Sequence, residues 1–221
     1  RVDHPGRHSG ADGDRQIAQP HRPPHPVRHP VRREQVQVEI KHIHRRLGNT
    51  IVFVTHDQTE ALTMSDRVAV FAGGRLQQVA SPTQIYDRPQ NPFVASFVGE
   101  NNVLDGTVRS TGPDEVVVDL DCGVAQASRT ATAFSVGDRA KVAIRPERLR
   151  IGEEASERQN VLTGTLREVF FMGEQLRTDV ELPNAQRIVV KDANRGQHTA
   201  EDRGTPIRLS YGTNDSWAFR P

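Results

Sequence analysis

The side chains best suited to chemistry stand together at Thr55-His56-Asp57, directly after the apolar run Ile51–Val54. Histidine is the side chain that most readily exchanges a proton near neutral pH. Asp57, with Glu60 three positions later, forms the pattern of a helix N-cap and its capping-box partner. His56 is therefore predicted at the point where a strand ends and a helix begins. Open α/β sheets bind their ligands at that edge.

The elements around His56 indicate an α/β unit. The run Ile51–Val54 is typical of a fully buried parallel strand. Four apolar residues before it repeat with helical spacing: Val36, Ile40, Ile43 and Leu47. Gly48 supplies a C-terminal stop for that helix. We therefore expect an amphipathic helix, a buried strand, and a second helix from Asp57 to about Met64.

A β-hairpin and two short helices are predicted next. Two strand-like runs flank Gly73-Gly74: Arg67–Phe71 and Leu76–Val79. Ser81-Pro82 and Asn91-Pro92 each combine an N-cap residue with a proline at the first helical position. The buried side of the second helix is expected to consist of three residues, with Gly99 as the stop: Phe93, Val94 and Phe97.

After Asn102 the pattern becomes all β. Seven strand-like runs are separated by Gly, Pro, Asp or Asn: Val103–Val108, Glu115–Leu120, Arg139–Ile144, Leu162–Phe170, Leu176–Leu182, Arg187–Val190 and Ile207–Ser210. Short strands with such regular breaks predict a small barrel or sandwich. Arg145 and Glu147 lie between two of these runs, and we expect them to form an exposed structural ion pair.

Composition narrows the class of protein. A formal net charge of +1 over 221 residues argues against a nucleic-acid-binding surface. The single cysteine, Cys122, excludes an internal disulfide and fits a reducing compartment. No apolar run approaches the roughly 18 residues of a membrane span, so no direct membrane insertion is expected.

Residues 1–33 differ from the rest because they are rich in His, Arg and Pro and nearly lack large apolar side chains. We expect this segment to be disordered. Three histidines have a helical spacing that could suggest a metal site: His21, His25 and His29. The prolines between them forbid that helix, so no metal site is expected. A basic tail that binds nucleic acid is disfavoured because aromatic residues are absent.

The octet Val54-Thr-His-Asp-Gln-Thr-Glu-Ala61 resembles the switch-histidine region of ABC-transporter ATP-binding subunits. Three further motifs extend the resemblance: Ser65-Asp66-Arg67, Gly73-Gly74-Arg75 and Ser81-Pro82. The resemblance covers roughly residues 34–221 and is greatest for importer subunits with a C-terminal TOBE domain, an oligonucleotide-fold-like β module. The segment Gly99–Gly106 is similar to the polyamine, ferric-ion and phosphonate importers.

This resemblance implies an α/β remnant of a P-loop nucleotide-binding domain at residues 34–101, followed by an all-β, OB-like TOBE barrel domain at residues 102–221. It also implies that His56 contacts the γ-phosphate of ATP. The intact family uses ATP and Mg and energises uptake of a small solute, such as a polyamine or ferric ion. Its partners are membrane permease subunits and a second ATP-binding subunit, which places it in the cytoplasm, peripheral on the inner face of the cell membrane.

Three motifs of that family are absent. The three lysines, Lys41, Lys141 and Lys191, do not follow a glycine-rich phosphate loop. The Leu-Ser-Gly-Gly-Gln signature and an Asp-Glu pair after an apolar strand are missing too. We therefore expect this chain to be a C-terminal portion only, without ATPase activity of its own. The alternative is a non-enzymatic regulatory or ligand-binding β module.

The resemblance resumes abruptly at Arg33-Glu34. A natural boundary would normally show a linker there, not a replacement of similar length. Our hypothesis is that residues 1–33 are a non-native tail, read out of frame until about Arg33. Translation of the upstream nucleotides in the other two frames tests this hypothesis.

Overall fold

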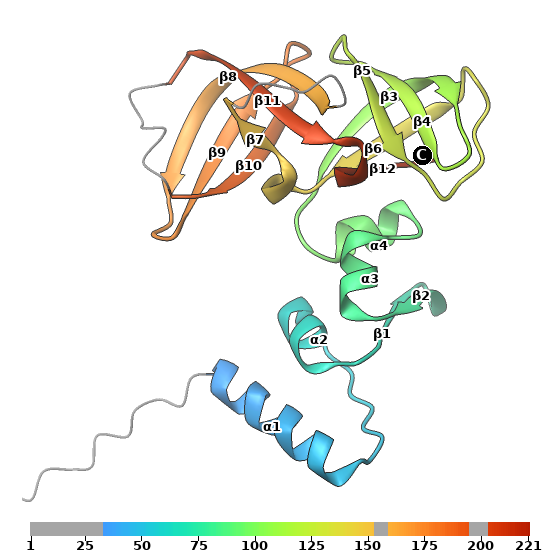
Figure 1. The fold of residues 1–221 in the computed structure, drawn as a ribbon, viewed down its shortest axis with the longest axis vertical. Coiled ribbons are helices and arrows are strands. Elements are labelled where there is room, and N and C mark those ends of the chain that lie inside the picture. Colours follow the sequence, from blue (N-terminus) through green and yellow to red (C-terminus); the bar gives the residue numbers. More distant parts are fainter. Residues whose placement is uncertain (1–32, 153–158, 195–202) are drawn as a thin grey trace, which may run out of the picture.

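The computed structural model describes residues 33–152, 159–194 and 203–221. Helices and a small hairpin form the N-terminal part, and two β units follow (Figure 1). The predictions of a disordered, out-of-frame tail and of no metal site among its histidines fall outside these residues, apart from Arg33, which begins the first helix. Among the described helices, none is long and apolar enough to cross a membrane.

The first helix, α1 (Arg33–Leu47), forms as predicted and ends at the predicted stop. Gly48 takes a positive φ of 66°, and its N–H donates to the carbonyl of His44 at 3.0 Å. The apolar face of α1, however, lies at the surface: Val36, Ile40, Ile43 and Leu47 are all exposed. Polar bonds tie α1 to the next helix, since Lys41 Nζ donates to the carbonyl of Thr63 at 3.1 Å.

The predicted buried strand at Ile51–Val54 is wrong. These residues form no strand in the structure, and the side chains of Val52 and Val54 are 87% and 99% exposed. A parallel strand needs neighbours on both sides to satisfy its backbone groups. No described strand pairs with this segment. Within the described part of the chain, this segment therefore has no sheet to join.

The next elements follow the local sequence signals closely. They are α2 (Gln58–Met64), β1 (Val68–Ala72), β2 (Arg75–Ala80), α3 (Pro82–Asp87) and α4 (Pro92–Phe97). Ser81 and Gln84 form the predicted capping box of α3. A small core joins the hairpin to both helices through Val70, Ile85, Val94 and Val98.

The predicted buried side of α4 is only partly correct. Val94 is buried, but Phe93 and Phe97 are 40% and 42% exposed. Their rings stack on each other with centroids 5.6 Å apart. Ala95 occupies the interface instead, where it packs against the barrel residues Ala143 and Phe219. A small side chain suits this position because it allows the helix to approach the sheet closely.

The first β unit is a closed barrel with the strand order β12-β5-β4-β3-β6. Its members are β3 (Asn102–Thr111), β4 (Glu115–Leu120), β5 (Ala125–Arg129), β6 (Arg139–Ile144) and β12 (Ser216–Phe219). The second unit is a five-stranded sheet with the order β10-β9-β8-β11-β7. Its members are β7 (Arg150–Ile151), β8 (Gln159–Phe171), β9 (Gln175–Glu181), β10 (Arg187–Ala193) and β11 (Pro206–Gly212). All seven predicted strands are present, and β5, β7 and β12 were not predicted.

The two β units are repeats of one another. Asn102-Val-Leu-Asp-Gly-Thr-Val-Arg109 in β3 and Asn160-Val-Leu-Thr-Gly-Thr-Leu-Arg167 in β8 share six of eight residues. Both strands carry a bulge at the same place in the repeat. A Cβ on Gly106 would lie 2.5 Å from the carbonyl oxygen of Asp119, and one on Gly164 would lie 2.8 Å from that of Glu181. The shared glycine therefore allows the neighbouring strand to pass closely.

Each repeat gives its last strand to the other. After the 3₁₀ turn η1 (Pro146–Arg148), β7 pairs with β11 of the second unit. After the matching turn η3 (Thr213–Asp215), β12 pairs with β6 and β5 of the barrel. Side-chain amides join the units further, because Asn102 exchanges two hydrogen bonds with the backbone of Val189 and Asn160 does so with Ala127.

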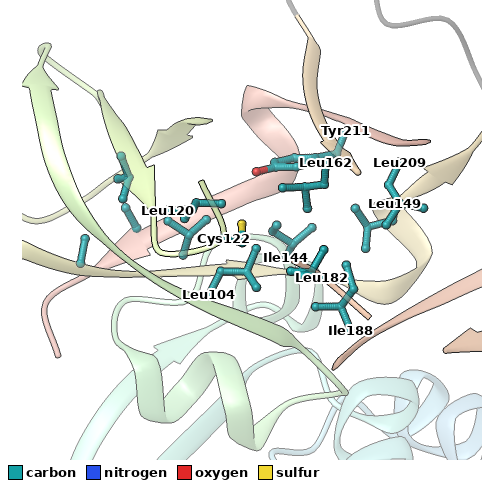
Figure 2. Packing of buried hydrophobic residues seen from close by; sticks show 14 of the residues in the cluster. Leu104, Leu120, Cys122, Ile144, Leu149, Leu162, Leu182, Ile188, Leu209 and Tyr211 are labelled. Atoms are coloured by element: carbon teal, nitrogen blue, oxygen red, sulfur yellow. The ribbon is translucent and has the colours of Figure 1, made fainter. Parts of the chain in front are cut away.

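One hydrophobic core runs through both β units. Figure 2 shows Leu104 and Ile144 of the barrel beside Leu182 and Ile188 of the second unit. Cys122 is a free thiol inside this core. The strand exchange and the common core make the two repeats one structural body.

Candidate functional site: the His56 loop and the junction with the barrel

Side-chain hydrogen bonds shape the loop around His56. Asp57 Oδ1 accepts from the N–H groups of Thr59 and Glu60 at 2.9 and 3.2 Å, as an N-cap does. Thr55 Oγ1 accepts from the N–H of Asp57 at 3.0 Å and donates to Glu60 Oε2 at 2.8 Å. The predicted N-cap is thus present. In a capping box the Glu60 carboxylate would accept directly from the N–H of the N-cap residue. Here the Thr55 hydroxyl lies between these two groups and bonds to both.

His56 lies at the bend between the two side chains that fix this loop, and it is exposed. An exposed imidazole held on a rigid turn can donate to or accept from a ligand that approaches from solvent. The described residues contain no group of three or more side chains that could hold a metal ion. His56 is the only histidine of this loop, and the described residues include no glycine-rich loop of the kind that cradles phosphate groups.

A hydrogen bond connects the helix that follows His56 to the entrance of the β units. Gln58, the first residue of α2, accepts at Oε1 from the N–H of Gly99 at 2.8 Å. Gly99 has a positive φ of 77°, which a residue with a Cβ adopts only with strain. A Cβ here would also lie 2.8 Å from Nη1 of Arg145. The loop is therefore tied to the chain at the point where it turns into the barrel.

Arg145 holds that turn from the other side. Only 7% of it is exposed, and its guanidinium donates to the carbonyls of Val98, Glu100 and Tyr86. The guanidinium also lies over the ring of Tyr86, with Cζ 3.9 Å from the centroid. Burial lowers the pKa of Arg145. The expected exposed ion pair with Glu147 is wrong, because Arg145 is buried and binds backbone carbonyls.

Glu147 also links the helical part to the barrel, through a hydrogen bond with Tyr86. Its carboxylate accepts from the hydroxyl of Tyr86 at 2.5 Å. Burial, together with this hydrogen bond to a carboxylate, raises the pKa of Tyr86 to about 12. The phenol therefore keeps its proton under ordinary conditions, and it binds the end of α3 to η1.

The second β unit reaches the junction through Glu100. This carboxylate accepts from Nη1 of Arg177 at 3.0 Å and forms an ion pair with Nζ of Lys191 at 2.8 Å. The hydrogen bond from Lys191, followed by that from Arg177, lowers the pKa of Glu100. Residues 98–100 are thus held by the His56-side helix, by the barrel and by the second β unit.

The sequence did not indicate this junction. Gln58, Tyr86 and Arg145 are 28 or more residues apart, and no spacing or pattern in the sequence links the three. The only local signal was the pair of close neighbours Arg145 and Glu147. The structure shows that each of them binds a residue of the helical part rather than the other.

Residues 142–219, from β6 to β12, match the TOBE domain family. With the octet around His56 and the two β repeats, this match defines the class. The chain corresponds to a C-terminal portion of an ABC-importer ATP-binding subunit that carries a TOBE domain.

Its curated relatives are of the polyamine type. The spermidine/putrescine import ATP-binding protein PotA of Rubrobacter xylanophilus is 36% identical over 81% of this chain and 47% of its own length. The proteins of the same name from Methylococcus capsulatus and Thermobifida fusca are 41% and 37% identical over 81% and 85% of this chain, and 47% and 49% of their own lengths. The chain therefore spans about half the length of these relatives.

Among solved structures, this chain is similar to the cytoplasmic molybdate-binding protein ModG with molybdate bound, with a TM-score of 0.47 and 19% sequence identity. The match covers 54% of this chain and 96% of that one.

Proposed function

We propose that the intact protein is the ATP-binding subunit of an ABC importer, and that it energises uptake of a polyamine or a similar small solute. The similarity to spermidine/putrescine import ATP-binding proteins carries this proposal, because it extends over 81–85% of the chain in the three relatives. That span is long enough to include both the His56 region and β strands.

In this proposal residues 34–101 are the C-terminal part of the nucleotide-binding domain and residues 102–221 are the accessory domain. The exposed apolar run Ile51–Val54 supports the first assignment. A segment with the composition of a buried strand, but without a described partner strand, fits a sheet that another portion of the protein supplies. The exposed apolar face of α1 supports it in the same way.

His56 is proposed to contact the γ-phosphate of ATP in the intact protein, where other residues hold the nucleotide and Mg. The hydrogen bonds of Thr55, Asp57 and Glu60 fix the loop that presents it. Permease subunits in the membrane and a second ATP-binding subunit would be its partners, at the cytoplasmic face. The chain of 221 residues alone is expected neither to bind ATP tightly nor to hydrolyse it.

A chimera tests this proposal. Residues 34–221 replace the corresponding portion of the Methylococcus capsulatus relative, which is 41% identical. In cells of that organism without their own copy, the chimera is expected to restore spermidine uptake. The purified chimera is expected to hydrolyse ATP, and His56→Ala to lower the rate at least about a hundredfold, as loss of a transition-state contact does.

His42→Ala is the matched control, because His42 is an exposed histidine on α1. This variant should retain the activity of the chimera. A chimera that is folded but inactive, or equal effects of the two histidine substitutions, would contradict the proposal.

A regulatory or ligand-binding β module is the second candidate. The continuous core of the two β units favours it, because this part of the chain has its own hydrophobic interior. A fragment of residues 102–221 that binds a ligand or protein, together with an inactive chimera, would select this function.

A further inference from the structure

A cavity of about 380 Å³ lies where the helical part meets the barrel. Its walls come from the residues at the end of α3, from β5, β6 and β12, and from the turns η1 and η3. This volume is in the range of pockets that bind small molecules. The cavity is distinct from the His56 loop, which contributes no residue to it.

The lining of this junction cavity is rich in positive charge. Four arginines and two aspartates line it: Arg88, Arg129, Arg145, Arg148, Asp87 and Asp215. Four guanidinium groups against two carboxylates give a net charge of +2. Both carboxylates pair with Arg148, at 3.1 Å for Asp87 and 3.5 Å for Asp215. The other three arginines form no ion pair with any described residue.

Arg145 is a buried cation that forms no ion pair with a described carboxylate, and Glu147 and Asp87 attract its charge only from beyond ion-pair distance. Its described contacts are three carbonyl oxygens and the ring of Tyr86, none of which carries a full negative charge. Burial of a charge is costly unless an opposite charge lies close by. An anion in the cavity that Arg145 lines would compensate this charge.

The guanidinium groups of Arg88 and Arg129 have N–H donors available for such an anion. The backbone of Arg88 is bonded to Gln84 and Gln78, but its guanidinium forms no hydrogen bond or ion pair with another described residue. Arg129 donates from Nη1 to Asn214 Oδ1 at 3.1 Å and lies over the ring of Trp217, which leaves other N–H groups of the fork. Guanidinium groups bind carboxylate and phosphate groups through two parallel hydrogen bonds.

We propose that the junction cavity binds a small organic anion that carries a phosphate or a carboxylate group. Arg88 and Arg129 hold the anionic group, and the bound charge compensates Arg145. The ligand contacts the end of α3 and the barrel together, so it stabilises the junction of the two parts. This inference does not rest on the proposed transport function.

The chain contains its own reporter of this site, because Trp217 is the only tryptophan and lines the cavity. The full chain is titrated at constant ionic strength with inorganic phosphate and, separately, with citrate, and tryptophan fluorescence is recorded. At least one of the two anions is expected to give a saturable change and to raise the melting temperature. Which of them binds identifies the anionic group.

Arg88→Gln is the test variant, since Arg88 has no described side-chain partner whose loss would disturb the fold. It is expected to weaken binding of the anion at least about tenfold, the effect of one charged hydrogen bond. Arg109→Gln removes the same charge from an exposed ion pair on β3 and should bind as the parent does. No saturable response to either anion at millimolar concentration, equal affinity of the two variants, or a stronger response to spermidine overturns the proposal.

Discussion

Replacement of Arg145 by alanine should separate the helical part from the barrel. Loss of the guanidinium leaves the buried carbonyl of Val98 and the partly buried carbonyl of Tyr86 without this donor, at about 2 kcal/mol each. Loss of the contact with the ring of Tyr86 adds about 1 kcal/mol. Removal of a desolvated charge returns about 2 kcal/mol. We expect a net decrease of about 3 kcal/mol in the free energy of unfolding of the junction.

Urea denaturation followed by the fluorescence of Trp217 measures this change. The indole is a suitable probe because its Nε1 donates to the carbonyl of Asp87 across the same junction, at 2.8 Å. Arg109→Ala is the control, since this arginine forms an exposed ion pair with Asp119, and its loss should cost less than about 1 kcal/mol. If Arg145→Ala costs no more than this control, Arg145 does not hold the junction.

Three further predictions concern the junction, the tyrosines and the β units. Gly99→Ala should lower the free energy of unfolding by about 3 kcal/mol, because the new Cβ would clash with Arg145. Gly123→Ala is the control and should cost about 1 kcal/mol, since Gly123 also has a positive φ but no atom near its Cβ position. Equal costs of the two substitutions in urea denaturation would refute the clash with Arg145. Burial and the Glu147 hydrogen bond raise the pKa of Tyr86 to about 12, so the stability that its protonated phenol contributes is complete below about pH 10 and is lost as the pH rises through about 12. Burial raises the pKa of Tyr211 too, and its contribution is lost only at higher pH. Ultraviolet absorbance that shows phenolate near pH 10 in the folded chain would contradict this. A fragment of residues 102–221 should unfold cooperatively in calorimetry, because it has its own hydrophobic core. The helical part, residues 34–101, should not unfold cooperatively on its own. A broad transition of the β fragment would show that its core needs the helices.

Local signals in the sequence predicted local structure well. The stop at Gly48, the hairpin turn at Gly73-Gly74 and the capping box of Ser81 with Gln84 all occur as expected. Each depends on residues within four positions of one another, so the sequence contains the whole interaction.

Burial and pairing were harder to predict because they depend on distant partners. Ile51–Val54 has the composition of a buried strand, but composition does not state whether a neighbouring sheet is present. Strand β5 (Ala125–Arg129) escaped prediction because it consists of small and polar residues whose burial comes from the barrel around it. The repeat of Asn102–Arg109 in Asn160–Arg167 was detectable in the sequence, but the exchange of strands between repeats was not.

Because the two repeats exchange their last strands, the barrel cannot close until the second repeat has been synthesised. Seventy-two positions separate the end of β6 at Ile144 from the start of β12 at Ser216, which closes the barrel. At translation rates of about 5–20 residues per second, the nascent barrel waits roughly 4–14 s with the facing edges of β5 and β6 unpaired. Open strand edges can pair with other chains. A ribosome-bound chaperone would therefore matter most in this interval, while the second repeat is being translated and the first cannot yet close.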